Sequence, residues 1–434
     1  MRRRALCGQW AVLLAVSVCL GLSTARSEPA TREMTLEQAM EKARRANRSL
    51  VALRAHLAQA RTNLDLAWSA LFPTVAAQGK YTRNNIEFVF PIGQQLVTVQ
   101  PKNQLDGVVS FTLPLIAPPA YVALQAVKSS VHASEADFET SETTVLFSVA
   151  QAFYAAASTD EVMLARQSNI EVARATLQYA QTRHKNGSVT KADVDRAELA
   201  LVRAEQGALE AKFANEQAYR ALATLIQSER DFKVRAVAST AMPEETVNLD
   251  LALRLRPEFR ALELSTQAAD AQGRANAWRW APTLSAFGNL RVFNYDNFAQ
   301  QRHSWAIGAQ LDWLLYDGGA RDAQRHLANA QAEEAAAQSA VLRDTIGDDL
   351  SNGRDLLDTK RHAQEAAERS VALARETLAL VRTQYEAGSA AQIDLLQAQD
   401  GLVAAQETLA QAHFEVALAD LTLRRAAGTF PGRS

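Results

Sequence analysis

The spacing of apolar residues in the C-terminal part of the chain predicts a long coiled-coil helix. Large side chains recur every seventh residue, and alanines recur at the same spacing between them: Leu395, Leu402, Leu409, Val416 and Leu423, then Ala398, Ala405, Ala412, Ala419 and Ala426. Such a repeat favours close knobs-into-holes packing. The stretch from Ala120 to Asn186 contains no glycine or proline, and it predicts a helix of roughly 100 Å at about 1.5 Å per residue.

Two stretches share one pattern around a glycine. They read HKNGSVTKADVDRAE over residues 184–198 and YEAGSAAQIDLLQAQ over residues 385–399. Four pairs of identical residues align: Gly187 with Gly388, Ser188 with Ser389, Asp193 with Asp394, and Ala197 with Ala398. Glycine suits the left-handed position that ends a helix. Each stretch therefore predicts a tight tip between two long helices, at about 184–193 and 385–394.

Helix start signals follow each glycine. Ser389 with Gln392 three residues later predicts a capping box at the second tip, and Thr190 with Asp193 predicts a weaker one at the first. Asp394 is expected in the second turn of its helix, where the influence of the helix dipole fades.

Segments between the helical stretches alternate apolar and polar residues. In SWAIGAQLDWLLY (304–316) one face carries Trp305, Ile307, Leu311 and Trp313, and similar alternation predicts strand hairpins at about 74–113 and 283–316. Strands of about ten residues cross a bilayer when they are tilted. Trp280, Trp305 and Trp313 lie in or beside these segments, as in a membrane aromatic belt. The edge of a soluble sandwich is the alternative interpretation.

The whole plan occurs twice. FPTVAAQG (72–79) resembles APTLSAFG (281–288), and both precede a strand segment, a long helical stretch and a glycine tip. The repeats cover about 34–230 and 249–428, and a linker at about 230–248 joins them. Neither half is expected to bury its own seam, so residues 26–434 are predicted to form one protomer. A simple coiled-coil rod is the alternative, but a rod does not carry paired strand segments.

The strand count predicts an oligomer. A sheet in lipid may not leave open edges, and two hairpins provide too few strands to close a pore. Three copies would give about twelve strands, within the usual range of membrane barrels.

The N-terminus predicts export. Arg2, Arg3 and Arg4 precede the apolar run AVLLAVSVCLGL and the small residues Ser23–Ala25, which together indicate a signal peptide over residues 1–25. A short buried helix or a membrane anchor is the alternative. Both cysteines, Cys7 and Cys19, lie inside this segment, so the mature chain is expected to have no disulfide. No later apolar run predicts a transmembrane helix.

Composition narrows the function classes. The net charge is -2, and no basic patch indicates nucleic acid. The histidines show no metal-ligand spacing, and the chain lacks a Gly-x-Ser-x-Gly elbow and a phosphate-binding loop. We therefore expect neither an enzyme nor a cofactor or a metal site. A periplasmic coiled-coil adaptor or scaffold without a pore remains an alternative, although adaptors carry a single helical hairpin.

Taken together, the sequence resembles the TolC family of outer membrane channel proteins from about Met34 to Gly428. The resemblance rests on the signal peptide, the duplicated plan, LLYDGGARDAQ (314–324) after the last strand, and YEAGSAAQIDLLQAQDGLVAAQETLAQA (385–412) at the second tip. It implies a mainly α protein with a small β part. Three protomers would share a twelve-stranded outer-membrane barrel, which a coiled-coil helical barrel continues into the periplasm of a Gram-negative bacterium.

The resemblance also implies a function and partners. The homotrimer would be a passive exit tunnel in outer-membrane lipid for a tripartite efflux pump or a type I secretion system. The linker and the chain ends would form an equatorial belt. The tips, at Gly187, Ser188, Gly388 and Ser389, would dock a periplasmic adaptor that serves an inner-membrane pump of the RND or ABC type. The cargo and the pump class stay open.

Residue roles at the tips follow from the same resemblance. Asp193 and Asp394 match acids that line the narrow periplasmic entrance, where crowded carboxylates attract cations and raise one another's pKa. The alternative role is stabilisation of a helix N-terminus. Tyr385 matches an aromatic latch residue of the closed tip, and Gln397 stands where the family often has a second acid.

The sequence departs from the family at the tips. Arg196 stands at the matching place in the first half and is expected to neutralise Asp193 in part. Ala390 occupies a position that is often basic, and His184 stands in the first half where Tyr385 stands in the second. Fewer polar links than usual are therefore expected to hold the tips closed.

Overall fold

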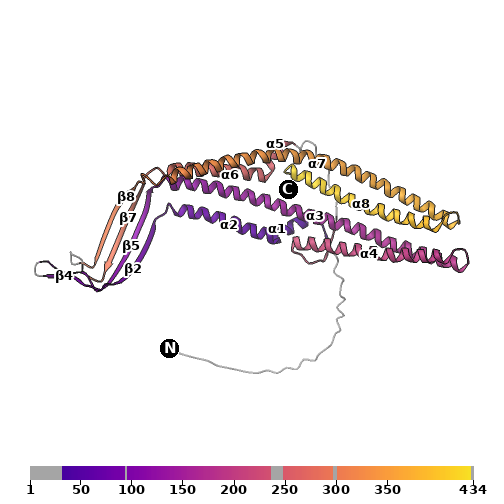
Figure 1. Cartoon of the computed structure of the whole chain (residues 1–434), viewed down its shortest axis with the longest axis horizontal. Coiled ribbons are helices and arrows are strands. Elements are labelled where there is room, and N and C mark those ends of the chain that lie inside the picture. Colours follow the sequence, from indigo (N-terminus) through magenta and orange to yellow (C-terminus); the bar gives the residue numbers. More distant parts are fainter. Residues whose placement is uncertain (1–31, 93–94, 236–247, 297–300, 432–434) are drawn as a thin grey trace, which may run out of the picture.

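The chain forms a long, narrow molecule with a small sheet at one end and paired helices along the rest (Figure 1). The computed structural model describes residues 32–92, 95–235, 248–296 and 301–431. The expected signal peptide (1–25) and linker residues 236–247 lie outside the described residues. The helices run from the sheet to two turns at the far end of the molecule, so the predicted tips lie at the end opposite the strands.

The first repeat runs from helix to hairpin and back to helices. Its elements are α2 (Arg48–Ser69), β2 (Thr74–Arg83), β5 (Asn103–Ile116), α3 (Pro118–Lys185) and α4 (Lys191–Ile226). Helix α3 is continuous over 68 residues, as the absence of internal glycine and proline predicts. Ala117 precedes two prolines, and proline is well accommodated in the first turn of a helix.

The second repeat has the same order of elements. They are α6 (Pro257–Trp278), β7 (Thr283–Phe293), β8 (His303–Asp312), α7 (Ala320–Glu386) and α8 (Gln392–Ala426). The internal duplication is therefore confirmed. Helix α7 has 67 residues, nearly the length of α3.

The two repeats contribute two strands each to one antiparallel sheet, in the order β2-β5-β7-β8. The pairing register places apolar residues on one face, among them Val75, Tyr81, Leu105, Val109, Phe111, Leu290, Val292, Trp305, Ile307 and Leu311. These side chains are exposed in the single chain, with Ile307 at 79% and Val75 at 70%. The other face carries Gln78, Lys80, Gln104, Asp106, Ser110, Asn289, Arg291 and Gln310. Strands β2 and β8 each have one unpaired edge within the described sheet.

Two details of the strands differ from the sequence prediction. An additional hairpin, β3 (Phe88–Ile92) and β4 (Gln95–Gln100), extends the first hairpin beyond β2 and β5. The final strand ends at Asp312 and not, as predicted, at Tyr316. The alternation of apolar and polar residues thus continues beyond the part of the chain that pairs in the sheet. There the Trp313 indole N–H donates to the carbonyl of Trp280 at 3.2 Å, because the chain has turned from the sheet towards α7.

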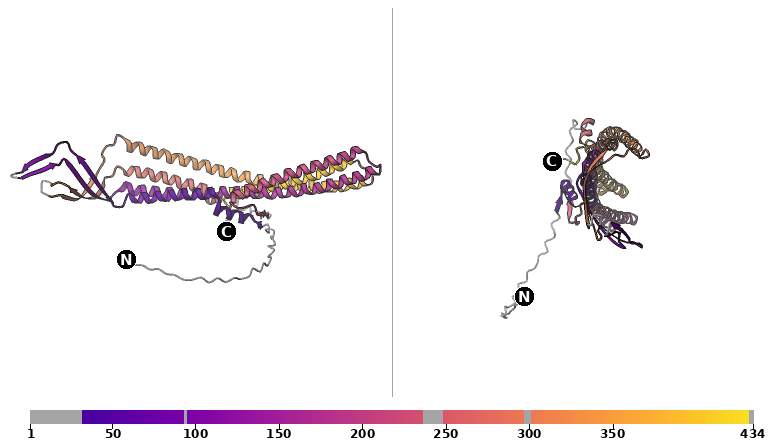
Figure 2. Two further views of the ribbon diagram at one scale, coloured as in Figure 1. Left: turned by 90° about the horizontal axis from the view of Figure 1, so that it is seen from below. Right: turned by 90° about the vertical axis from the view of Figure 1, so that its left-hand side faces the viewer.

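The main core lies midway along the molecule, where short elements cover the long helices. Strand β1 (Arg32–Met34) pairs in parallel with β6 (Phe232–Val234), and α1 (Leu36–Ala46) packs beside them. The cluster includes Leu146, Phe153, Leu222 and Phe430. Figure 2 shows α1 and the C-terminus on the convex side of the arc of helices. Strand β1, strand β6 at the start of the linker, and Phe430 near the C-terminus thus meet at one level.

A polar network ties this level to α3 and α4. The Tyr219 hydroxyl donates to Asp160 Oδ2 at 2.6 Å and accepts from the backbone N–H of Val234 at 3.2 Å. Asn215 donates to the other oxygen of Asp160 at 2.7 Å. Burial raises the pKa of Tyr219 well above its ordinary value, with the hydrogen bond to Asp160 as a second cause. Asn215 is thus a buried polar residue of α4 whose side chain is satisfied by a carboxylate of α3.

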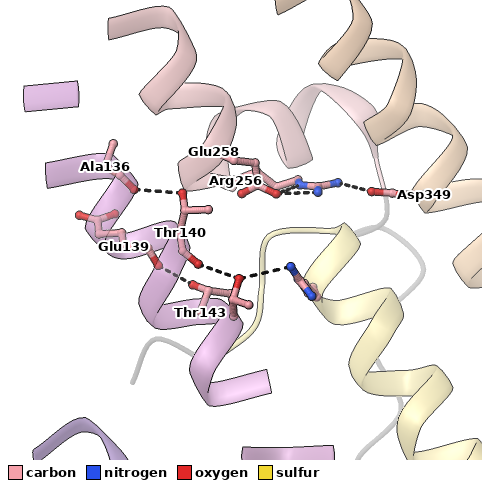
Figure 3. Close-up of polar contacts among 9 residues, drawn as sticks. Ala136, Glu139, Thr140, Thr143, Arg256, Glu258 and Asp349 are labelled. Carbon is pink, nitrogen blue, oxygen red and sulfur yellow. Dashed lines mark hydrogen bonds and ion pairs between the residues drawn. The ribbon is translucent and has the colours of Figure 1, made fainter. Parts of the chain in front are cut away.

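A second polar cluster fixes the start of the second repeat. Helix α5 (Leu249–Leu255) is followed by its C-cap residue, Arg256, and Pro257 begins α6. Figure 3 shows the Arg256 side chain between two carboxylates: it contacts Glu258 Oε1 at 2.6 Å and Asp349 Oδ2, on α7, at 2.9 Å. The Arg256 side chain is only 9% exposed. Its contacts with Glu258 and Asp349 join the start of α6 to α7.

The heptad seam of α8 is buried in part. Leu395, Ala405, Ala412, Ala419, Leu423 and Ala426 are buried, whereas Leu402, Leu409 and Val416 are half-buried. A further buried row contains Gln399, Val403 and Ala410. Ser158 and Thr176 of α3 hydrogen bond to Ala410 and Gln399 of this row. Helix α8 thus packs against α3 as well as against α7.

Candidate functional site

The two tips have the same backbone turn. Gly187 and Gly388 take positive φ angles of 73° and 81°, a region that glycine reaches without steric cost. In each tip the following serine N–H donates at 2.9 Å to the carbonyl five residues earlier: Ser188 to Arg183, and Ser389 to Gln384. The predicted left-handed ends of the two helices are correct.

Asp193 caps the helix that follows the first tip. Its Oδ2 accepts from the Thr190 hydroxyl at 2.7 Å and from the Thr190 backbone N–H at 3.0 Å. Arg196 donates to Oδ1 at 3.0 Å. The Thr190 hydroxyl bond, followed by the Thr190 backbone N–H and Arg196, holds the pKa of Asp193 below its ordinary value. The expected pairing of Arg196 with Asp193 is present. Crowding in a trimer would act against this lowering.

At the second tip the predicted capping box is wrong. The Ser389 hydroxyl donates to the carbonyl of Gln384 at 3.0 Å, and the helix begins at Gln392. Ala391 is the residue before it, and its N–H donates to Asp394 Oδ2 at 3.1 Å. Asp394 therefore lies in the first turn and not, as predicted, in the second. The prediction was wrong because the helix starts two residues later than a cap at Ser389 would place it.

Tyr385 lies inside the second tip. Its ring is 4% exposed, lies 5.8 Å from the Tyr179 ring, and has the Arg183 guanidinium 5.5 Å above it. Arg183 also donates to the Tyr385 carbonyl at 3.1 Å, which joins the two hairpins. Burial raises the pKa of Tyr385. Its hydroxyl is buried and has no hydrogen-bond partner among the described residues.

A groove of about 420 Å³ lies between the two helical hairpins beside Tyr385. It is lined by Glu171, Thr176, Tyr179, Arg382, Glu386 and Gln399, among others. At its base Gln399 donates to the Thr176 hydroxyl at 2.9 Å. Within the described chain neither side-chain polar atom of the nearby buried Gln392 is hydrogen bonded. The second tip thus keeps buried polar groups without partners among the described residues, which costs stability.

The structure brings some of the predicted tip residues together and leaves others apart. Tyr385 belongs to a cluster with Tyr179 and Arg183, which sequence reasoning did not find. The only feature of the sequence that could have indicated a role for Arg183 is its position directly before His184, the first residue of the predicted tip. His184 contacts the carbonyl of Val189 at 3.0 Å within its own tip, and Gln397 is exposed on α8.

The tryptophans lie at two levels of the sheet. Trp280 and Trp313 flank the junction with the helices, and Trp305 lies near the start of β8, at the far end. The eight steps from Trp305 to Trp313 span about 26 Å at about 3.3 Å per residue. This is close to the height of the apolar band of a membrane barrel, about 25 Å. Each of the three side chains is exposed.

Within the described ranges, no helix combines the length and apolarity needed to span a bilayer. No group of three or more potential metal-ligating side chains occurs among the same residues.

Comparisons with known proteins agree with this architecture. The model of the family described as "Outer membrane efflux protein" matches residues 39–227 and 248–429. The outer membrane efflux protein BepC of Brucella suis is 23% identical over 96% of this chain and 90% of its own length. The alkaline protease secretion protein AprF of Pseudomonas aeruginosa is 24% identical over 61% of this chain and 59% of its own. The structure of the outer membrane protein VceC of Vibrio cholerae aligns with a TM-score of 0.76 and 19% identity, over 91% of this chain and 96% of that one.

A duplicated helical hairpin that continues a sheet with one apolar, exposed face defines the protomer of an outer-membrane channel. The chain belongs to the outer membrane efflux protein family. It is a protein of the Gram-negative outer membrane that extends into the periplasm. The interpretation as a periplasmic adaptor without a pore is therefore wrong.

Proposed function

We propose that three copies of this chain form a passive exit channel through the outer membrane. The observation that carries the proposal is the four-stranded sheet with an exposed apolar face and two unpaired edges. Unpaired edges are not tolerated in lipid, so β8 of one copy pairs with β2 of the next. Three such sheets close a barrel of about twelve strands, whose lumen is lined by the polar face.

In this assembly the helices continue the barrel as a tunnel and the tips form its entrance. Asp193 and Asp394 lie at equivalent places after Gly187 and Gly388. Repeated around a threefold axis, they form a carboxylate ring that favours cations. Both carboxylates also cap their helices, so the ring is held by the same bonds that start α4 and α8. Tyr385 and Gln397 lie where neighbouring tips would meet.

The tips are also the proposed docking surface for a periplasmic adaptor. Gly187, Ser188, Gly388 and Ser389 form the two exposed turns at the end opposite the sheet. The adaptor would link the channel to an inner-membrane pump of the RND or ABC type, which supplies the energy. The relatives include one named for efflux and one named for protease secretion. The proposal therefore covers both an efflux pump and a secretion system. The chain itself acts as a conduit and not as an enzyme.

Single-channel recording in a planar bilayer tests this proposal. The wild-type protein is expected to give small, steady, cation-selective openings. Asp193→Ala combined with Asp394→Ala is expected to enlarge the current and reduce the selectivity. Asp195→Ala is the matched control, because this acid lies on the same helix but outside the cap. If the double substitution changes neither the current nor the cation selectivity, the carboxylate ring is excluded. If the protein folds as a trimer but gives no channels, the role as an exit channel is excluded.

A further inference from the structure

A recess lies on the polar face of the sheet, near the end far from the helices. It has a volume of about 330 Å³ and is lined chiefly by Lys80, Gln104, Asp106, Arg291, Phe293 and Tyr295. The pairing register explains the cluster: Lys80 on β2 lies opposite Asp106 on β5, and Asp106 lies opposite Phe293 on β7. Arg291 lies two residues before Phe293, on the same face of β7.

This face is lumenal if the channel is built as proposed, so the inference rests on the proposed function. Residues on the two faces alternate along each strand. The neighbours of Lys80 and Arg291, namely Tyr81 and Val292, point to the apolar face and are exposed at 62% and 50%. In a barrel that face contacts lipid, and the recess opens into the water-filled lumen.

The recess carries an excess of positive charge. Asp106 Oδ2 accepts from Gln104 at 2.8 Å and its Oδ1 accepts from the Tyr295 hydroxyl at 3.3 Å. Lys80 and Arg291 form no salt bridge within 4.0 Å with any carboxylate of the described chain, and both side chains are exposed. The recess therefore holds one carboxylate, Asp106, which is already hydrogen bonded, and two cations, Lys80 and Arg291, whose N–H groups can donate to a ligand.

The wall beside these cations is aromatic. The rings of Phe293 and Tyr295 lie 5.3 Å apart at an interplanar angle of 44°. A flat ring fits such a wall by edge or offset contacts. A guanidinium recognises a carboxylate with paired donors, and an ammonium does so as a point charge. The recess therefore combines an anion contact with an aromatic contact.

We propose that this recess is a binding site for small aromatic carboxylates at the exit of the channel, present once per protomer around the lumen. It lies at the opposite end of the chain from Asp193 and Asp394. An organic anion that has passed the opened tips thus meets charges of the opposite sign before it leaves. Weak binding there raises its local concentration in the lumen and favours its exit over that of other solutes.

Block of the single-channel current by 2-hydroxybenzoate tests the site. The compound is added to the compartment that faces the free end of the sheet, and the concentration for half block is measured. Lys80→Gln combined with Arg291→Gln is expected to raise that concentration about tenfold or more, because charge-assisted hydrogen bonds are lost. Lys80→Arg is expected to retain the block. Acetate, which has no ring, is expected to block the wild type less.

Arg83→Gln is the matched control, since Arg83 is on the same strand with the same charge but on the other face. If this control raises the half-block concentration as much as the double substitution does, the anion responds to the overall positive charge of the sheet and not to a specific site. The proposal then fails. An unchanged block in the double variant also overturns it. Both results would leave the channel itself in place, whereas the absence of any channel would instead exclude the proposed function. An intact trimer on unboiled gels verifies that the variants fold.

Discussion

Arg321 holds the turn between the sheet and the longest helix of the second repeat, and its replacement tests how that junction is stabilised. The side chain is 2% exposed. Its Nε donates to Asp317 Oδ2 at 2.9 Å and its Nη1 to the carbonyl of Leu314 at 2.7 Å. The guanidinium also lies 3.8 Å from the centre of the Trp280 ring. These contacts account for Asp317 and Arg321 in the LLYDGGARDAQ stretch.

The expected magnitude follows from burial. Arg321→Met leaves the Asp317 carboxylate, 15% exposed, with the Arg321 backbone N–H but no cation. Removing one partner of a buried pair costs about 3–5 kcal/mol. Unfolding entropy of about 2.1 cal/mol/K per residue, over roughly 400 residues, makes 1 kcal/mol worth about 1 °C. We therefore expect the melting temperature to fall by about 4–6 °C.

The assay is loss of helical circular dichroism on heating the purified protein in detergent. Arg321→Lys keeps a charge but not the planar fork, so it is expected to melt between the wild type and Arg321→Met. Arg325→Met is the control, because Arg325 is exposed one turn further along α7. A melting temperature for Arg321→Met within about 1 °C of the control would refute the reasoning, since a buried pair cannot be lost at so small a cost.

Three further substitutions test the tips and the core. Thr190→Val removes the main cause of the lowered pKa of Asp193, so the pKa rises and the negative charge is lost at a higher pH as the solution is acidified. In an Asp394→Asn background, the midpoint of cation selectivity against pH should therefore move upward, and an unmoved midpoint would contradict the assignment. Ala391→Thr supplies the missing cap of α8 and is expected to stabilise it by about 1 kcal/mol, which slower amide hydrogen exchange at residues 392–395 would reveal. Tyr219→Phe removes a hydroxyl bonded to a carboxylate and is expected to cost about 1.5–3 kcal/mol; a melting curve equal to that of the wild type would count against the network.

The local elements were predictable because each depends on residues close in sequence. The long helices follow from unbroken runs and seven-residue spacing, and the tips follow from Gly187 and Gly388. The strands follow from alternation. The predicted start of the helix at the second tip was wrong. Whether Ser389 or Ala391 is the N-cap residue depends on how far the preceding turn extends.

The signals for the candidate site were unequal. Asp193 and Asp394 stand out because the same acid recurs at the same place in both repeats. The aromatic cluster of Tyr179, Arg183 and Tyr385 has no such signal, because its members come from two different hairpins. Only the packing of α3 beside α7 and α8 brings them together.

The sequence by itself determined the duplication, the helical tips, the alternating strands and the resemblance to outer membrane channels, since these are patterns of period two, three and a half, or one repeat. The tertiary structure decided which strand pairs with which, and so placed Lys80 and Arg291 on one face of the sheet, although they belong to different repeats. It also decided that Asp160 meets Tyr219 and that Arg256 meets Asp349. Such contacts join residues far apart in the chain, where the balance between desolvation and hydrogen bonding depends on neighbours that a local pattern does not specify.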